Sequence, residues 1–455
     1  MNNESGKESK ESEKSDIANN AKANIYADNG DKTQKISAGK HAANSAESNE
    51  KSDSASKAAI NNASANNVAA NDTAASNRKP AANDVSDAKL NANAKPRTKE
   101  HFAHTFKNHD INFAKKQAEK LAIVIVTYKR RELLQVLFDS IKQLTVAPWR
   151  IIVVDNENSD ATRSAVMNFS DELNGKWGQA DADATGSQQR VIYAPQAENL
   201  GGAGGFSAGV KTAYDLGAEW FWVMDDDVAV EPAAIERLAP WMPQYEAIQA
   251  SRYDYDGGDF YWQYNFIVPL GIPNPVAPAQ FGPRGYAKMN TMCFEGALFR
   301  RSIVDKIGLP DPRFFIYWDD TIYGYLASKV CKPIVIADKT MRRTRVINNW
   351  DIAGVRQLNS TSDMNRYYIM RNRGHMARYF MDNGDFHPML FALGTAATAV
   401  KELIRIIAVD NKSFFSGISN LFCGWRDSRE ILHDPSWQPM QPMQPMQPMK
   451  SSQSA

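Results

Sequence analysis

A short apolar run that ends in three adjacent carboxylates constrains this chain most. Residues 220–224 are Trp-Phe-Trp-Val-Met, and Asp225, Asp226 and Asp227 follow directly. The run is aromatic and β-prone, so it predicts a buried strand. Three neighbouring carboxylates repel one another near a core, and a divalent cation relieves that repulsion. The sequence therefore predicts either a metal site beside a phosphate-bearing ligand, at the carboxyl end of a strand, or a solvated acidic turn before a helix.

Both ends of the chain differ in composition from its middle. Residues 1–100 are rich in Asn, Ala, Ser and Lys, and residues 438–449 repeat Gln-Pro-Met four times. Such segments bury too little apolar surface to offset the entropy of ordering them. We therefore expect disorder in 1–100 and 435–455, an α/β domain over 101–345 and a helical region over 346–434.

Charge and cysteine content exclude several classes of function. The 455 residues include 53 Lys and Arg against 52 Asp and Glu, which argues against a nucleic-acid partner. The 3 cysteines are widely spaced and form no zinc or disulfide pattern, as is usual in a reducing cytosol. We find no secretory signal and no apolar run of spanning length, so a cytoplasmic location is expected.

The first half of the folded part alternates strands and helices. Apolar runs predict buried strands at 121–127, 150–154, 190–194 and 220–224. Helical spacing predicts helices at 132–144, 159–169 and 201–216, with a loop at 171–189. This alternation indicates a Rossmann-like, mostly parallel sheet with helices on both faces. Thr127, Tyr128, Asp155 and Asn199 follow strands, so we expect them near the aspartates, at the carboxyl edge of the sheet.

The glycines at 201–205 allow two interpretations. They could bring backbone N–H groups against a phosphate, or they could only permit a left-handed residue and close packing of a helix on the sheet. They do not follow the dinucleotide-binding spacing, which argues against NAD.

The second half carries another acidic pair. We expect a strand at 291–300, a helix at 303–307 capped by Ser302, and a helix that begins at Asp319 and Asp320 after an aromatic run. A carboxylate at such a position caps a helix, or it serves as a general base toward a hydroxyl.

In this order the motifs resemble those of family 2 inverting glycosyltransferases with the GT-A fold, over residues 121–337. The matching segments are Val-Ile-Val-Thr-Tyr-Lys-Arg (124–130), Val-Val-Asp-Asn (153–156), Glu-Asn-Leu-Gly-Gly-Ala-Gly-Gly-Phe (198–206), Met-Asp-Asp-Asp (224–227), Phe-Glu-Gly-Ala-Leu-Phe-Arg-Arg (294–301) and Trp-Asp-Asp (318–320). Together they look most like bacterial galactofuranosyltransferases, with rhamnosyltransferases close behind.

The resemblance implies transfer of a sugar from a nucleotide-sugar to a hydroxyl of a cell-envelope glycan or polyprenyl-linked acceptor. The implied donor is UDP-galactofuranose, or alternatively dTDP-rhamnose. The implied site residues are Asp225 and Asp227 for Mn²⁺ or Mg²⁺; Thr127, Tyr128, Arg130, Asp155, Asn199, Gly201, Gly202 and Asp226 for the nucleotide-sugar; Asp320 as base and Asp319 for the acceptor hydroxyl; and Trp318 and Glu295 on the acceptor side.

One segment departs from the family pattern. The galactofuranosyltransferases carry a metal-ligating His after the strand that follows the Trp-Asp-Asp helix, whereas residues 334–346 have none. Arg342, Arg343 and Arg345 stand there instead, either to neutralise a diphosphate or to pair on the surface or with a lipid head group. His375 lies further on, and a lone His on a helix is interpreted as structural.

The C-terminal region predicts helices at 367–380 and 387–409. The second helix is apolar over 389–400 but too short to span a bilayer, so it docks on the domain, packs in a homo-oligomer or lies at the inner face of the cell membrane. Two other functions remain open: a catalytically silent glycan- or nucleotide-binding scaffold, and a nucleotidyltransferase, which would need a glycine-rich basic loop after the first strand.

Overall fold

The computed structural model describes residues 110–258, 265–274, 281–346, 349–352, 356–410 and 414–443. The expected disorder of 1–100 therefore lies outside the described residues, as does that of 444–455. Residues 98–455 form one compact unit, which contains both the sheet and the C-terminal helices.

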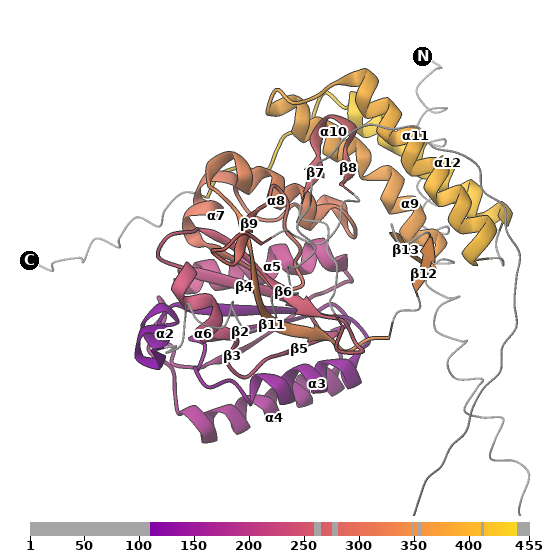
Figure 1. The fold of residues 1–455 in the computed structure, drawn as a ribbon. Helices are drawn as coiled ribbons and strands as arrows, with labels where there is room; N and C mark the ends of the chain where they lie inside the picture. The colour runs from indigo at the N-terminus through magenta and orange to yellow at the C-terminus, as the bar shows by residue number, and fades with distance from the viewer. Residues whose placement is uncertain are drawn as a thin grey trace, which may run out of the picture. The chain divides into compact units, whose positions relative to one another are not determined.

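A nine-stranded sheet in the order β3-β2-β1-β4-β10-β6-β11-β5, with β9 paired to β11, forms the centre of the fold (Figure 1). Its strands are β1 (Leu121–Thr127), β2 (Arg150–Asp155), β3 (Val191–Pro195), β4 (Trp220–Asp225), β5 (Val228–Val230), β6 (Ala247–Tyr253), β9 (Tyr286–Lys288), β10 (Ala297–Arg300) and β11 (Ile334–Arg343). The four strands of the first half are parallel, as predicted. Beyond β4 the sheet is mixed, because β10 runs antiparallel to both β4 and β6.

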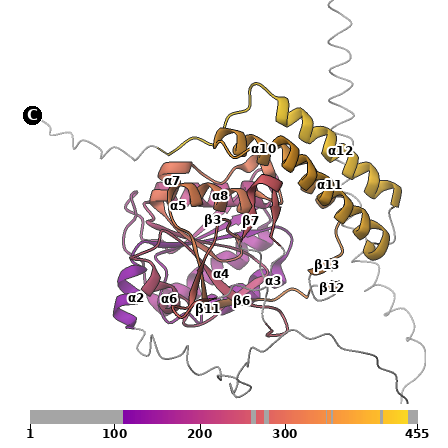
Figure 2. The ribbon, with the colours of Figure 1, turned by 45° about the horizontal axis from the view of Figure 1, so that its top comes forward.

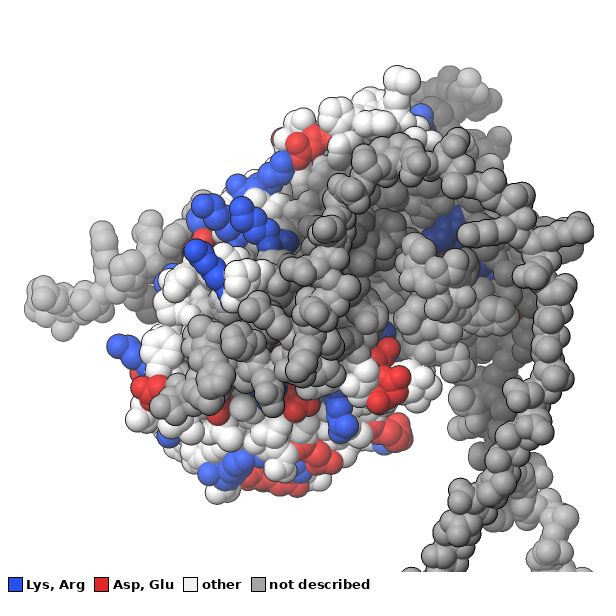
Figure 3. Space-filling model, in the orientation of Figure 1, with Lys and Arg blue, Asp and Glu red and all other residues white. Residues whose placement is uncertain are grey.

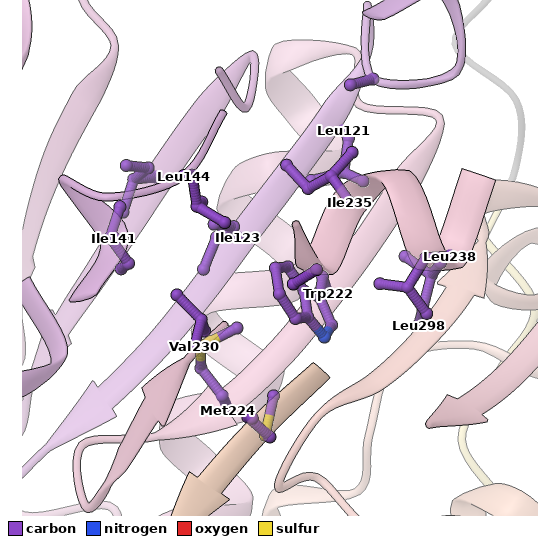
Figure 4. Close-up of a cluster of buried hydrophobic side chains, with 14 of the residues drawn as sticks. Leu121, Ile123, Ile141, Leu144, Trp222, Met224, Val230, Ile235, Leu238 and Leu298 are labelled. Atoms are coloured by element: carbon purple, nitrogen blue, oxygen red, sulfur yellow. The ribbon is translucent and has the colours of Figure 1, made fainter. Parts of the chain in front are cut away.

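Helices cover both faces of the sheet. One face carries α2 (Ile111–Gln117), α3 (Arg131–Ile141), α4 (Asp160–Trp177) and α6 (Ala234–Leu238), and the other carries α5 (Gly201–Leu216), α7 (Arg301–Ile307) and α8 (Asp319–Val330). Alternate residues of β1 enter the two cores, because successive side chains of a strand point to opposite faces. Ile123 joins Trp222 and Met224 in one core (Figure 4), whereas Val124 packs in the other.

The remaining elements complete the unit. They are η1 (Ala239–Trp241), β7 (Phe266–Ile267), η2 (Val268–Leu270), β8 (Ile272–Pro273), η3 (Pro312–Phe314), β12 (Asn349–Ile352), β13 (Arg356–Asn359), α9 (Asp363–Arg371), α10 (Arg373–Asp382), α11 (Pro388–Arg405), the π-helical η4 (Ile406–Asp410) and α12 (Phe414–His433). Helix α12 packs along α9 and α10, and the second view shows α11 beside α12 (Figure 2). On the lower part of the face in Figure 3, basic and acidic side chains are mixed.

Some expected boundaries were wrong. Helix α4 continues through the expected loop to Trp177, because Phe169 and Leu173 extend its buried stripe, and Gly178 at φ 69° ends it. The strand expected at 291–300 is confined to β10, because Gly296 turns the chain at φ 99°.

Two further expectations failed at helix ends and in the tail. Ser302 does not cap α7; the helix begins at Arg301, and the Ser302 hydroxyl donates to Glu246. Residues 435–443, which we expected to be disordered, pack on the domain instead. Trp437 is buried there, and its indole N–H donates to His375.

Candidate active site

The carboxyl ends of three parallel strands bring the predicted polar residues to one edge of the sheet. Thr127 of β1 pairs in register with Asp155 of β2, and Val126 pairs with Asp225 of β4. Parallel strands share their carboxyl edge, which is where open α/β sheets bind ligands.

Three carboxylates form an acidic cluster at this edge. Asp225, Asp227 and Glu295 each offer an oxygen atom, and these oxygens lie within 4.8 Å of one another. Burial raises the pKa of Asp225 well above its ordinary value, and the charges of Asp227 and Glu295 raise it further. The Oδ1 atom of Asp227 is buried without a hydrogen-bond partner. A hard divalent cation takes carboxylate oxygens and removes this repulsion, so the cluster fits Mn²⁺ or Mg²⁺.

Two arginines orient Glu295 in the cluster. The buried Arg252 of β6 donates to the carboxylate of Glu295 and, at 2.8 Å, to its carbonyl oxygen. Arg343, at the end of β11, donates from Nε and Nη2 at 3.2 Å each. Burial alone would raise the pKa of Glu295, but these two guanidinium groups bring it below its ordinary value. Glu295 is therefore an ionised member of the cluster, although we had assigned it to the acceptor side.

Of the three arginines at 342–345, only Arg343 contacts the cluster through a described bond. Arg342 and Arg345 are exposed. Arg343 pairs across the sheet with Val228, the residue after Asp227, which explains why it reaches the carboxylates.

The middle aspartate is bound by protein groups. Asp226 is fully buried; the Thr127 hydroxyl donates to its Oδ2 at 2.7 Å, and Arg130 Nε lies 3.1 Å from its Oδ1. Arg130 also donates to Asp227 at 2.8 Å. Burial raises the pKa of Asp226 to about 6, although Arg130 partly opposes this. Three residues expected at the nucleotide-sugar thus bind one another, and they hold the aspartate turn in place.

Asp155 and Asn199 shape the neighbouring turns. Asp155 is buried and accepts hydrogen bonds from the backbone N–H groups of Glu157 and Ser159 and from the Tyr193 hydroxyl. Asn199 accepts from the backbone N–H of Gly201 at 2.9 Å, at the start of α5. Tyr128 lies half-buried beyond the end of β1.

The glycine-rich segment forms the first turns of α5 rather than a turn before it. An added Cβ at Gly205 would lie 2.5 Å from Val126, and one at Gly209 would lie 2.4 Å from Val124. These glycines therefore allow the helix to lie close on the sheet, as the structural interpretation predicted. At Gly202 nothing lies within 4 Å of an added Cβ, so this side of the helix start is open to a ligand.

The second acidic pair lies at the start of α8. The nearby Cys293 thiol lowers the pKa of Asp320 and the Glu295 charge raises it, while the Asp320 charge acts in turn on Arg252. Burial is the main cause that raises its pKa. Asp319 is buried, and burial followed by the Asp320 charge raises its pKa well above the ordinary value. The two acidic groups are thus close enough for their charges to act on one another through Glu295 and Arg252.

Trp318 points elsewhere. Its indole N–H donates to the carbonyl of Ile369 in α9 at 3.0 Å, and its ring meets Phe266 edge-on. His375 is buried beneath Trp437, where burial lowers its pKa to about 3, in agreement with the structural role assigned to it.

Sequence reasoning missed Arg252, Cys293 and Asn372. Arg252 and Cys293 reach the site through sheet pairing and a turn, and neither residue has a motif of its own. Asn372 stands in the segment Tyr367-Tyr-Ile-Met-Arg-Asn372, which had drawn attention only for the His that follows it.

Part of the chain is similar to known proteins. Residues 122–308 match the family described as Glycosyl transferase family 2. The chain is 29% identical over 215 residues to galactofuranosyltransferase GlfT1 of Mycolicibacterium smegmatis, covering 44% of this chain and 63% of the relative. It is 27% identical over 214 residues to GlfT1 of Mycobacterium tuberculosis, covering 44% of this chain and 62% of that protein. The match thus spans less than two thirds of each relative.

A solved structure is also similar. Staphylococcus aureus TarS residues 1–349 align with a TM-score of 0.42 and 10% identity, over 69% of this chain and 81% of that one. Over residues 122–308 the chain is thus similar to glycosyltransferase family 2.

Proposed function

We propose that this protein is a metal-dependent inverting glycosyltransferase that moves a sugar from a nucleotide-sugar to a hydroxyl of a glycan or polyprenyl-linked acceptor. The observation that carries the proposal is the shared environment of its two acidic groups. Glu295 lies in the cluster with Asp225 and Asp227, and it also interacts with Asp320. A charge-compensating site and a basic carboxylate are the two parts that single-displacement sugar transfer needs.

In the proposed reaction Asp320 accepts the proton of the acceptor hydroxyl. The hydroxyl oxygen forms a bond to the anomeric carbon while the bond from that carbon to the diphosphate oxygen breaks. Attack from the face opposite the leaving group inverts the anomeric centre, and the nucleoside diphosphate leaves with the bonding electrons. Asp319, beside the base, would hold the acceptor hydroxyl in line, which is a positioning contribution.

Asp225, Asp227 and Glu295 are the residues that would hold Mn²⁺ or Mg²⁺. When bound, the cation supplies positive charge to the departing diphosphate. Arg130 fixes Asp227, and Arg343 fixes Glu295, so the ligands are oriented before the cation arrives. Glu295 would be the third ligand, although the family pattern takes a histidine ligand from the segment that is residues 334–346 here. Arg343, in that segment, would meet further diphosphate charge.

For the donor we propose UDP-galactofuranose, on the similarity to the two galactofuranosyltransferases, with dTDP-rhamnose as the alternative. The test is a panel of UDP- and dTDP-sugars with a lipid-linked glycan acceptor, with Mn²⁺, with Mg²⁺ and with EDTA. Released nucleotide is the readout. Release only with UDP-galactofuranose and a cation supports the proposal; full release in EDTA refutes its metal dependence.

A catalytically silent binding scaffold is the competing function. Isothermal titration calorimetry decides between them, because a scaffold would bind a nucleotide-sugar without releasing nucleotide on any acceptor. The Asp320→Asn variant is the matched control: it should bind the donor as the wild type does but transfer no sugar.

We also propose that α11 lies against a lipid surface at the inner face of the cell membrane. The large exposed apolar residues in this region are Met389, Leu390, Leu393, Val400, Ile404, Ile407, Phe414, Phe415, Phe422 and Trp425. Two charged side chains of α11 turn inward instead: Glu402 is fully buried and paired with the buried Arg405. The exposed Phe and Trp side chains belong to the neighbouring α12, and amphipathic helices with such residues on the apolar face bind bilayer interfaces.

Among the described residues, no helix combines the length and apolar character that crossing a bilayer requires. Flotation of the full chain with phosphatidylglycerol–phosphatidylethanolamine vesicles tests the membrane proposal. Leu393→Asp with Ile404→Asp should abolish flotation, whereas Met167→Asp, at an exposed apolar residue of α4, should not. If the double variant instead only converts a dimer to a monomer in light scattering, the face is an interface of a homo-oligomer and the membrane proposal is wrong.

A further inference from the structure

The segment that leads into Asp319 and Asp320 has an unusual backbone. Phe315, Tyr317 and Trp318 have φ angles of 62°, 68° and 72°. Of the five non-glycine residues with positive φ in the described part of the chain, these three lie within four positions. Bulky side chains rarely adopt this conformation, and it persists only where the surroundings impose it. Something must therefore hold this aromatic loop, residues 314–318, in place.

One side chain holds three of its carbonyls. The Asn372 amide nitrogen donates to the carbonyl oxygens of Phe314 at 2.8 Å, Ile316 at 2.8 Å and Tyr317 at 3.0 Å. The amide has two hydrogens, so the three acceptors share them. Its oxygen accepts from Arg371 Nη1 at 2.9 Å, which fixes the amide orientation. Asn372 is fully buried, so water cannot replace these bonds.

The last turn of α9 supports the same loop at other points. Arg371 Nη1 donates to the Arg313 carbonyl at 2.7 Å, immediately before the loop. The Phe315 ring stacks on Tyr368, with centroids 4.9 Å apart. Together with the Trp318 bond to Ile369, these contacts come from residues 368–372. Residues 368–372, where α9 ends and α10 begins, therefore support the aromatic loop.

The aromatic loop touches both halves of the site. At one end, the Phe315 carbonyl accepts from the backbone N–H of Ala203 at 3.0 Å, at the start of α5. At the other end, Asp319 and Asp320 begin α8 directly after Trp318. A shift of the loop would thus move the base relative to the glycine-rich helix start, and small misplacements of reacting groups lower rates strongly.

We infer that Asn372 is a positioning residue for sugar transfer: it holds the aromatic loop so that Asp320 faces the acidic cluster. This inference rests on the proposed function, in which Asp320 is the base. A capping role for Asn372 does not account for its contacts, because neither α9 nor α10 receives a hydrogen bond from its side chain as an N-cap, and its amide donates only to the loop carbonyls.

The test compares Asn372→Asp, Trp318→Phe and Asn383→Ala with the wild-type full chain. Asn372→Asp keeps the shape but presents a second oxygen to three carbonyls. Trp318→Phe removes the hydrogen bond from the loop to the Ile369 carbonyl without burying a charge. Asn383 is the matched control, because its amide also donates to a backbone carbonyl, that of Tyr379 at 2.9 Å, away from the loop. Each variant is measured for kcat, for donor KM, for UDP affinity and for hydrogen exchange of residues 315–322.

We expect Asn372→Asp to lower kcat by about 100-fold, with UDP affinity within about threefold of wild type and faster exchange of the loop. Trp318→Phe should lower kcat by about 10-fold, and Asn383→Ala should change neither quantity. The inference is overturned if kcat stays at the wild-type value in both loop variants. It is also overturned if UDP affinity falls in these variants by the same factor as kcat. If the wild type releases no nucleotide from any donor, the proposed function fails. The role of Asn372 is tested separately by hydrogen exchange: if exchange of residues 315–322 is unchanged in Asn372→Asp, Asn372 does not hold the loop.

Discussion

Gly201 and Gly202 are adjacent in sequence, and the structure predicts opposite effects when each is replaced by alanine. Gly201 has φ 69°, and an added Cβ would lie 2.1 Å from the Phe315 carbonyl oxygen and 2.8 Å from its carbonyl carbon. Real Cβ atoms do not approach that closely, so the aromatic loop must move. At Gly202 an added Cβ meets nothing within 4 Å.

The magnitudes follow from two costs. A left-handed conformation costs an alanine about 1–2 kcal/mol, and overpacking against backbone costs about 1–3 kcal/mol more. Gly201→Ala should therefore lower the free energy of unfolding by about 2–5 kcal/mol. Residue 202 is helical in the folded state, and alanine has less conformational entropy than glycine in the unfolded chain. Gly202→Ala should therefore raise the free energy of unfolding by up to about 1 kcal/mol.

Urea unfolding followed by far-ultraviolet circular dichroism measures both effects, and nucleotide release measures the functional consequence. Gly201→Ala should lower kcat because the aromatic loop leads directly into α8, which carries Asp320. Gly202→Ala should keep its fold but raise donor KM, since the open space beside it is where a donor would approach. Equal stability of the two variants would refute the argument from Cβ clashes, and an unchanged donor KM in Gly202→Ala would refute the assignment of that space to the donor.

Three further predictions follow from the charges. Asp225→Asn should remove one ligand and the repulsion at once, so calorimetric Mn²⁺ binding should be lost while the melting temperature does not fall; retained Mn²⁺ binding would exclude the cluster as the site. Arg252→Met leaves the buried Glu295 with one guanidinium fewer and should cost about 3 kcal/mol of unfolding free energy in urea. The control Lys142→Met removes ion pairs with the exposed Asp139 and Glu172 and should cost less than about 1 kcal/mol. His375 is neutral in the folded state with a pKa of about 3, below the value near 6.5 of an unfolded histidine, so its contribution to stability is present above pH 6.5 and is lost as the pH falls toward 3. Melting temperatures measured from pH 7 to pH 4 should fall less steeply in His375→Gln; an identical slope would contradict the burial argument.

The local pattern was sufficient for most of the first half of the fold. The strand over residues 121–127 was predicted with its observed bounds, because a continuous apolar run has few alternatives to a buried parallel strand. Prediction failed where the end of a helix was not clearly marked in the sequence. Helix α4 extends eight residues beyond its expected end, because its buried residues continue at helical spacing among the polar residues after Phe169. The antiparallel insertion of β10 between β4 and β6 could not be read from sequence, since pairing partners of a four-residue strand depend on distant segments.

The site divides in the same way. Asp225, Asp227, Asp319 and Asp320 were identifiable from sequence because clustered carboxylates next to apolar runs carry an electrostatic cost that implies a purpose. That Glu295 joins the first pair, and that Arg252 binds Glu295, was decided by sheet pairing and a turn at Gly296, which bring together residues more than forty positions apart.

By itself, then, the sequence determined the order of the elements and the identity of the acidic groups, since both follow from local periodicity and local charge. Only the tertiary structure decided which charges compensate one another and that Asn372, between two C-terminal helices, holds the loop before Asp319 and Asp320. The physical reason is that a buried side chain is defined by the partners that replace its water, and those partners come from parts of the chain that local pattern does not connect.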